Sequence, residues 1–407
     1  MKKVYLKGPL LTQSGYGHHA RTIFRALKTR PDIFDVYVQP IPWGQTSWLW
    51  EDNEERKELD LHLGKTIQYI NSGGKFDMSI QVTIPNEWEQ LAPINIGVTA
   101  GIETNMVSPE WIEKSSLMDK IITISEHSKN VYTGTTYEVT NEQTKEKQFF
   151  RTNVPIESVS YPVRTFTPKK LDLNLSTDFN FLTVAQLSPR KNINQLIKCF
   201  IEEYKDNENV GLIIKANMAK NSMIDRVNTV AGFKKLIGKQ DHKCKIYLLH
   251  GFLSDEEMAG LYTHSKIKAI VTTTHGEGFG LPLFEAAYYG LPVIATDWSG
   301  HLDFLNMPQK QKNGKLKHMF GRISYQLQKV EPEAVWDTVI PAESMWAFPE
   351  DASIKLNLEE VYKDHGRFKK RANQLKKWLL EEFSEQKIYE QIVELLPAEE
   401  ETDIVII

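Results

Sequence analysis

The sequence predicts a doubly wound α/β fold that occurs in two similar domains. Short runs of β-branched and aromatic residues alternate with amphipathic helical patterns, as in parallel strands joined by crossover helices. The strand-like runs are apolar throughout, which is typical of parallel strands covered on both faces. They fall into two sets along a chain of 407 residues, and a chain of this length ordinarily forms two or three domains.

The individual elements follow from these patterns. In the first half, we expect strands at residues 2–7, 34–41, 76–82, 94–99 and 120–125. In the second half, we expect strands at residues 179–185, 210–216, 245–250, 267–274 and 291–297. Between the strands, apolar residues recur with the helical period, on one face at Ala20, Ile23, Phe24 and Leu27 and on another at Ile193, Leu196, Ile197, Phe200, Ile201 and Tyr204.

The domain boundaries are placed where these patterns stop. A polar stretch at 137–152 has few strand signals, and we place the linker at 162–177, which gives domains at 1–165 and 166–365. The chain from 366 to 407 is predicted to be helical and to form a separate part. Residues 310–340 have no clear period and predict an irregular excursion.

Composition limits the function classes. The apolar and charged fractions are those of an ordinary globular protein, and the formal charge of −4 gives no overall electrostatic reason for binding nucleic acid or an anionic membrane. One segment, 367–378, predicts a basic amphipathic helix. Its cationic face is interpreted as solvated, and contact with a phosphate backbone or a membrane surface is the alternative.

The cysteines and the apolar runs indicate in which cellular compartment the protein is expected. Cys199 and Cys244 lie near apolar neighbours without a CxxC pattern, so we expect buried free thiols. The start of the chain is interrupted by Lys7 and Pro9, so it predicts a strand rather than a signal peptide. No run reaches the length of a membrane span. We therefore expect a cytoplasmic protein without stable membrane insertion.

The stretch 274–290 carries the strongest chemical signal. It reads THGEGFGLPLFEAAYYG, with Pro282 where a helix would begin and Gly290 where it would end. Glycines let the backbone approach a ligand, and the free amides of a first helical turn attract phosphate. Glu277 and Glu285 bracket this turn. Carboxylates beside a phosphate site suit hydroxyl donors, such as those of ribose and sugars.

This stretch resembles the signature of retaining GT-B glycosyltransferases of the sucrose synthase and mannosyltransferase type. The resemblance extends to VAQLSPRKNINQLI at 184–197 and to PVIATD at 292–297. Many members have Gly-Arg where this chain has Ala185 and Gln186, which leaves Arg190 and Lys191 as the basic pair. The resemblance implies the GT-B fold, in which two Rossmann-like domains face each other across a cleft and a C-terminal helix crosses back.

The resemblance also implies roles for individual residues. Arg190 and Lys191 would neutralise the diphosphate leaving group, Glu277 would hold the donor sugar, and Glu285 would hold the nucleotide ribose. The predicted catalytic residues are therefore Arg190, Lys191 and Glu277. The predicted donor-binding residues are Gly278, Phe279, Gly280, Leu281 and Glu285, together with Gly15 and Gly17 of a glycine loop at 7–17 that precedes the first helix.

Acceptor contacts are expected at strand ends of the first domain, because ligands of such sheets bind there. The candidates are Thr99, Glu103, Ser125 and His127. Capping of a helix by Ser125 is the structural alternative.

The function implied is transfer of a hexosyl group from a nucleotide sugar, a UDP- or GDP-sugar, with retention and without a metal or a resident cofactor. The acceptor is left open among glycans, small molecules and modified DNA, and no oligomeric state is specified. Three alternatives stand beside this function. They are a glycoside phosphorylase, a bacteriophage-type transferase acting on hydroxymethylated DNA bases, and a non-catalytic GT-B binding module.

Overall fold

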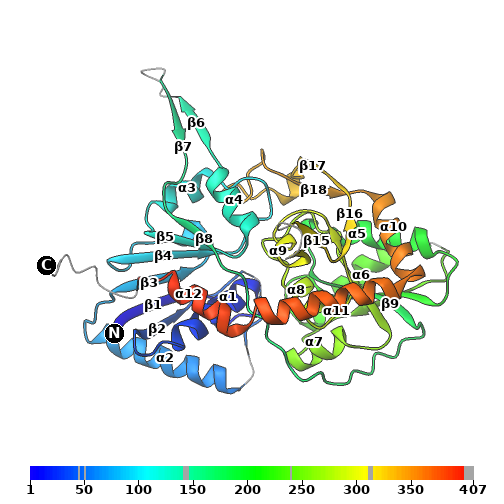
Figure 1. The fold of residues 1–407 in the computed structure, drawn as a ribbon, viewed down its shortest axis with the longest axis horizontal. Coiled ribbons are helices and arrows are strands. Elements are labelled where there is room, and N and C mark those ends of the chain that lie inside the picture. Colours follow the sequence, from blue (N-terminus) through cyan, green and yellow to red (C-terminus); the bar gives the residue numbers. More distant parts are fainter. Residues whose placement is uncertain (45, 50–51, 141–145, 239–240, 310–314, 398–407) are drawn as a thin grey trace.

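Two parallel sheets, side by side, form the frame of the molecule (Figure 1). The computed structural model describes residues 1–44, 46–49, 52–140, 146–238, 241–309 and 315–397. Within these residues each sheet has six strands, and helices cover both faces. The prediction of two doubly wound α/β domains is confirmed.

The first sheet has the strand order β2-β1-β3-β4-β5-β8. Its strands are β1 (Lys2–Gly8), β2 (Phe34–Pro40), β3 (Met78–Val82), β4 (Ile94–Thr99), β5 (Lys120–Thr123) and β8 (Ile156–Ser158). The helices of this part are α1 (Gly15–Lys28), α2 (Glu54–Asn71), α3 (Pro109–Ser115) and α4 (Glu126–Gly134). Val4 pairs in parallel register with both Val36 and Met78, and all three side chains are buried. The five predicted strands are confirmed, and β8 adds an edge strand.

The second sheet repeats this arrangement in the order β11-β10-β9-β12-β13-β16. Its strands are β9 (Phe179–Gln186), β10 (Val210–Asn217), β11 (Lys245–Leu249), β12 (Ile267–Val271), β13 (Val293–Thr296) and β16 (Gly321–Ile323). Its helices are α5 (Ile193–Tyr204), α6 (Met223–Ile237), α7 (Asp255–Tyr262), α8 (Leu281–Tyr288), α9 (Leu302–Leu305) and α10 (Asp351–Lys363). The predicted apolar face of α5 is buried throughout. Both cysteines are buried free thiols, as expected.

Two segments differ from their predictions. The polar stretch at 137–152 contains the antiparallel strands β6 (Tyr137–Thr140) and β7 (Lys147–Phe150), which project from the first domain (Figure 1). Their side chains are mostly exposed, so they show no buried apolar run. Residues 141–145 lie outside the described part of the chain.

The prediction of an irregular excursion at 310–340 is wrong where short strands form within that segment. It contains β15 (Leu316–His318), paired with β14 (Asn306–Pro308), and β17 (Tyr325–Lys329), paired with β18 (Met345–Pro349); residues 310–314 are not described. Strand β18 and the segment before it also contact the first domain. Met345 N donates to Asn105 Oδ1 at 2.7 Å, and Ser108 Oγ donates to the carbonyl of Thr338 at 2.8 Å.

The C-terminal helical prediction is confirmed with one break as far as residue 394, and residues 398–407 lie outside the described part of the chain. The chain forms α11 (His365–Glu382) and α12 (Glu385–Glu394), and Ser384 caps α12. Helix α11 lies on the second domain, where Leu375 and Leu379 enter its core. Helix α12 lies on α1 (Figure 1), and its buried residues belong to the core of the first domain. The two segments that pass between the domains also touch, because Val163 N donates to the carbonyl of Phe383 at 2.6 Å.

Of the basic residues of α11, Arg367, Lys370 and Lys377 are exposed, whereas Lys369, Arg371 and Lys376 are half-buried. Across the part of the chain that the structure describes, no helix combines the length and apolar composition that a membrane span requires.

Helix α12 should stabilise the first domain. We expect Ile392→Ala, at a side chain only 2% exposed, to lower the free energy of unfolding by about 2–5 kcal/mol, because it leaves a cavity against α1. Chemical denaturation followed by circular dichroism measures this loss. The exposed Glu394→Ala variant is the control, and equal stability of the two variants would contradict the packing described.

Candidate functional site

The loop between β12 and α8 folds as its sequence predicts. Gly280 adopts a left-handed backbone with φ of +93°, and its carbonyl accepts the amides of Leu283 and Phe284 at 2.9 and 3.1 Å. Pro282 occupies the first turn of α8, and Gly290, with φ of +80°, follows its end. The glycines and the proline therefore set where the loop ends and where the helix begins and ends.

Unpaired amides line this loop. Residues 276–280 are all buried. Among the described residues, the N–H groups of Gly278, Phe279 and Gly280 donate no hydrogen bond. Buried backbone donors are rarely left unpaired, and the first turn of a helix favours a negative charge. The loop therefore has the features of an anion-binding site.

Two cations converge on the same loop. Arg190 and Lys191 lie in a short 3-10 helix (Pro189–Lys191) directly after β9. Lys191 Nζ lies 2.5 Å from Glu277 Oε1, and Arg190 Nη1 lies 3.1 Å from Glu277 Oε2. Arg190 also donates to the carbonyl of Gly276 at 2.6 Å. The three predicted catalytic residues thus form one cluster.

The charge state of this cluster follows from its burial. Glu277 is only 8% exposed. Burial by itself would raise the pKa of Glu277, but Lys191 and Arg190 outweigh it and lower that pKa to about 2. Burial lowers the pKa of Lys191, opposed by the charge of Glu277. Near neutral pH, Glu277 is ionised and both cations are engaged with it.

A second loop, which the sequence analysis did not include, holds Glu277 in place. It follows β13, and there Ser299 has a left-handed backbone with φ of +85°. Ser299 Oγ accepts the amide of Glu277 at 2.9 Å, and Gly300 N donates to the carbonyl of Glu277 at 2.9 Å. The signal in the sequence is a Ser-Gly pair that follows the strand predicted at 291–297 after one residue, Trp298.

The first domain contacts the loop 276–280, the predicted donor loop, directly. A Cβ atom on Gly276 would lie 2.1 Å from the carbonyl oxygen of Glu103, and one on Gly278 would lie 1.9 Å from that of Ala100. Glu103 also pairs with Arg190 at 3.4 Å. Ser125 Oγ donates to the carbonyl of Gly278 at 2.6 Å. Two of the acceptor-side candidates, Glu103 and Ser125, therefore lie at the cluster.

Ser125 also caps α4, where its hydroxyl accepts the amide of Ser128. The capping interpretation is confirmed, and the interdomain bond is an additional contact.

The other two acceptor-side candidates, Thr99 and His127, differ in whether their polar atoms already have a hydrogen-bond partner. Thr99 is fully buried, and its hydroxyl is 2.8 Å from the hydroxyl of Tyr16. His127 lies with its ring centroid 5.0 Å from that of Trp298, and its buried Nε2 has no partner in the described part of the chain. Burial lowers the pKa of His127 to about 4, so its imidazole is neutral near pH 7.

The predicted glycine loop is partly helical. Gly15 and Gly17 lie in the first turn of α1 rather than in the loop before it. Gly17 is needed for packing, because a Cβ atom there would lie 2.2 Å from the carbonyl oxygen of Thr12. Gly15 is exposed, and its carbonyl accepts the hydroxyl of Tyr161 at 3.0 Å. The ring of Tyr161 contacts that of Phe279 at 5.1 Å, which connects α1 to the donor loop.

Glu285 lies in a different environment from Glu277. It is inside α8, where the hydroxyl of Tyr262 donates to its Oε2 at 2.8 Å. Burial raises the pKa of Glu285 to about 7, and the hydrogen bond from Tyr262 opposes this rise. The half-buried Leu281 opens the same helix. Within the described residues, no group of three or more His, Cys, Asp or Glu side chains converges as metal ligands.

Comparison of the sequence with known proteins concerns mainly the second domain. Residues 165–316 match the family Glycosyl transferases group 1. The serotype-specific mannosyltransferase WbdA of Escherichia coli is 34% identical over 118 residues, which are 29% of this chain and 13% of WbdA. The sucrose synthase of Melioribacter roseus is 30% identical over 128 residues, 30% of this chain and 16% of that protein. The chain thus spans a small part of the length of these relatives.

Comparison of structures covers nearly the whole chain. The sucrose-phosphate synthase of Thermosynechococcus elongatus has a TM-score of 0.61 at 13% identity, over 97% of this chain and 98% of that one. Anabaena Alr3699/HepE in complex with UDP-glucose has a TM-score of 0.56 at 13% identity, over 97% and 99%. The chain has the GT-B fold of glycosyltransferases, as the resemblance implied.

The contact between Gly278 and Ala100 leaves no room for a side chain. We expect Gly278→Ala to lower the free energy of unfolding by about 1–3 kcal/mol through overpacking between the domains. The comparison variant is Gly64→Ala in α2, where a Cβ atom would meet open space and where alanine should stabilise by about 0.5–1 kcal/mol. Thermal unfolding of both variants measures the difference, and two melting temperatures at or above the wild-type value would refute the close contact.

Proposed function

We propose that this chain is a glycosyltransferase that moves a hexosyl group from a nucleotide sugar to an acceptor with retention of anomeric configuration. The observation that carries the proposal is the convergence of Arg190, Lys191 and Glu277 on a loop of unpaired amides. Positive groups beside free amides suit a diphosphate, and a buried carboxylate between them suits a sugar hydroxyl.

In this mechanism, donor binding rearranges the ion cluster. The donor diphosphate accepts hydrogen bonds from the amides of Gly278, Phe279 and Gly280 and draws Arg190 and Lys191 away from Glu277. Glu277 then has an oxygen free to accept a hydroxyl of the donor sugar. The carboxylate keeps its position during this exchange because Ser299 and Gly300 hold its backbone.

The same cations promote departure of the leaving group. As the bond between the sugar and the diphosphate breaks, negative charge develops on the diphosphate, and Arg190 and Lys191 stabilise that charge in a buried setting. The acceptor oxygen forms a bond to the anomeric carbon on the face that the diphosphate leaves, and the acceptor proton passes to the departing diphosphate oxygen, so the configuration is retained. This step needs neither a metal nor a separate protein base.

The acceptor enters from the side of the first domain. Glu103 lies against Arg190, and Ser125 bonds the carbonyl of Gly278, so both lie next to the donor loop. The neutral His127 has a buried Nε2 without a partner among the described residues, and an acceptor hydroxyl that enters beside it would supply that partner. Contact between the two domains excludes water and limits hydrolysis of the donor.

A nucleotide sugar is the proposed donor, and a UDP-hexose is the first to test, because the similar Anabaena structure contains UDP-glucose. Thermal-shift measurements with UDP-, GDP- and ADP-hexoses test this choice, with the free nucleotides and hexose 1-phosphates beside them. We expect one nucleotide sugar to raise the melting temperature in a saturable way. Stabilisation by hexose 1-phosphate alone would instead support a phosphorylase.

Lys191 should matter for chemistry more than for folding. We expect Lys191→Gln to reduce kcat by about 100- to 1000-fold, because it removes one charge that stabilises the leaving group. Release of the nucleotide diphosphate measures the rate, and circular dichroism checks the fold. The control Lys234→Gln removes an exposed lysine of α6 and should keep the wild-type rate. Full activity of Lys191→Gln would rule out this mechanism.

Glu285 should make donor binding depend on pH. If its carboxylate accepts ribose hydroxyls, donor KM should fall as pH rises through about 7, the pKa of Glu285, and Glu285→Gln should flatten this profile. Glu285 should also make the stability of the fold depend on pH. Because its pKa in the folded state lies above the ordinary value, the free energy of unfolding should fall as pH rises from about 4.5 to about 7. Profiles of KM and of melting temperature from pH 5.5 to 8.5 separate the two effects. A wild-type KM that is independent of pH would exclude the ribose role.

A further inference from the structure

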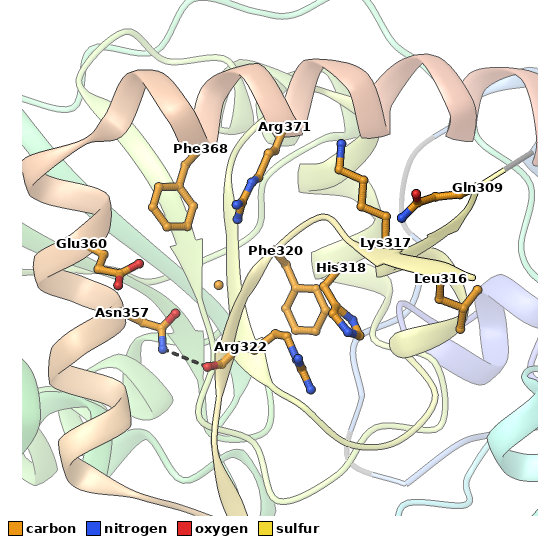
Figure 2. A pocket seen from close by; sticks show the side chains of 11 residues that line it. Gln309, Leu316, Lys317, His318, Phe320, Arg322, Asn357, Glu360, Phe368 and Arg371 are labelled. Carbon is orange, nitrogen blue, oxygen red and sulfur yellow. Dashed lines mark hydrogen bonds between the residues drawn. The ribbon is translucent and has the colours of Figure 1, made fainter. Parts of the chain in front are cut away.

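A second hollow lies outside the proposed donor site. Figure 2 shows it between α11, α10 and the segment that runs from β15 to β16. Its volume is about 450 Å³, which is within the range of small-molecule sites. The proposed transfer reaction uses none of the side chains that line it.

Among the residues that the structure describes, two cations in this hollow have no anionic partner. The Arg371 side chain descends from α11 toward Phe320 (Figure 2), and within the described residues its guanidinium makes no hydrogen bond or ion pair. Lys317 Nζ, from β15, donates only to the neutral amide of Gln374 at 3.0 Å. By contrast, Arg322 in the same wall pairs with the carboxylate of Asp297. Two positive charges from separate elements therefore face this space, and the carboxylate in its lining, Glu360, is already paired with Arg367 outside the hollow's own lining.

The surrounding charge strengthens this feature. Residues 365–378 of α11 carry six Lys and Arg residues and no Asp or Glu, in a chain whose net charge is −4. A concave surface beside a strongly basic helix concentrates counter-ions. The hollow is thus a place where this acidic protein attracts anions.

Aromatic side chains form the inner wall. Phe320 and Phe368 are 2% and 3% exposed, so their rings are fixed. The Arg371 guanidinium lies 5.7 Å from the centre of the Phe368 ring, which orients it. Two cations beside an apolar wall fit a ligand that combines a phosphate group with a carbon skeleton.

We propose that this hollow is a regulatory binding site for a phosphorylated small molecule of the size of a sugar phosphate. Arg371 and Lys317 bind the phosphate, and Phe320 and Phe368 contact the carbon skeleton.

The route from this site to the donor loop is short. Arg322 lies in β16, which pairs with β13, and its side chain holds Asp297 at the end of β13. The next residues along the chain include Ser299 and Gly300, which bind the backbone of Glu277. A ligand that shifts β16 or draws Arg322 from Asp297 therefore changes the position of Glu277. This coupling rests on the proposed transferase function, whereas binding in the hollow does not.

Binding is tested by calorimetry and thermal shift on the full chain. The probes are inorganic phosphate, hexose 6-phosphates and pentose 5-phosphates. We expect saturable binding of a sugar phosphate, weakened at least tenfold in Arg371→Gln and in Lys317→Gln. Lys370→Gln removes an exposed charge of the same helix and should leave the affinity unchanged. An equal loss in Lys370→Gln, or no binding of any probe to the wild type, would overturn the proposal.

A further comparison separates this site from the donor site. Binding should persist in Lys191→Gln, and the bound ligand should change donor KM or kcat at least threefold in the wild type but not in Arg371→Gln. Loss of binding in Lys191→Gln with retention in Arg371→Gln would place the ligand in the donor site and refute the second site. If no nucleotide sugar binds while the dependence on Arg371 remains, the proposed transferase function fails and the binding site stands.

Discussion

The burial of Glu277 is the constraint on which the site depends. An ionised carboxylate that is only 8% exposed needs cationic partners to offset its lost hydration. Arg190 and Lys191 supply them from the segment after β9, which is possible because β9 and β12 are neighbours in the sheet. Arg190 also reaches Glu103 of the first domain. One buried charge thus fixes two loops of the second domain and one contact between the domains.

The two glutamates of the donor stretch show how position decides chemistry for the same residue type. Glu277 lies against two cations, which hold its pKa at about 2, whereas burial with only a tyrosine hydroxyl as partner raises the pKa of Glu285 to about 7. The first is a permanent anion at neutral pH, and the second is balanced between two charge states. Glu277 and Glu285 are only eight positions apart, yet near pH 7 the first keeps its charge and the second titrates, because their surroundings differ.

Much of this arrangement could be predicted from the sequence, because it depends on local patterns. Buried strands appear as apolar runs, and Gly280, Pro282 and Gly290 mark the ends of the loop and helix. The edge strands β8 and β16 have three residues each, too few to form a pattern. Ser299 and Tyr262 reach the glutamates across more than 20 positions, and nothing local indicates such contacts. Thr99 was a reasonable acceptor candidate at a strand end, but Tyr16 engages its hydroxyl.

The hydrogen bond between Val163 and Phe383 has a mechanical consequence. The chain passes from the first domain to the second near Val163 and returns after Phe383, so both covalent connections run through one place. Because this hydrogen bond joins them, the two connections act together as one hinge, which is the pivot between the domains. The domains can then rotate about this point, while sliding or twisting would stretch one connection against the other. The buried loop lies beside this pivot, because Phe279 contacts the ring of Tyr161, two residues before Val163. A small change of angle at the pivot would therefore act directly on the loop that Gly276 and Gly278 pack against the first domain.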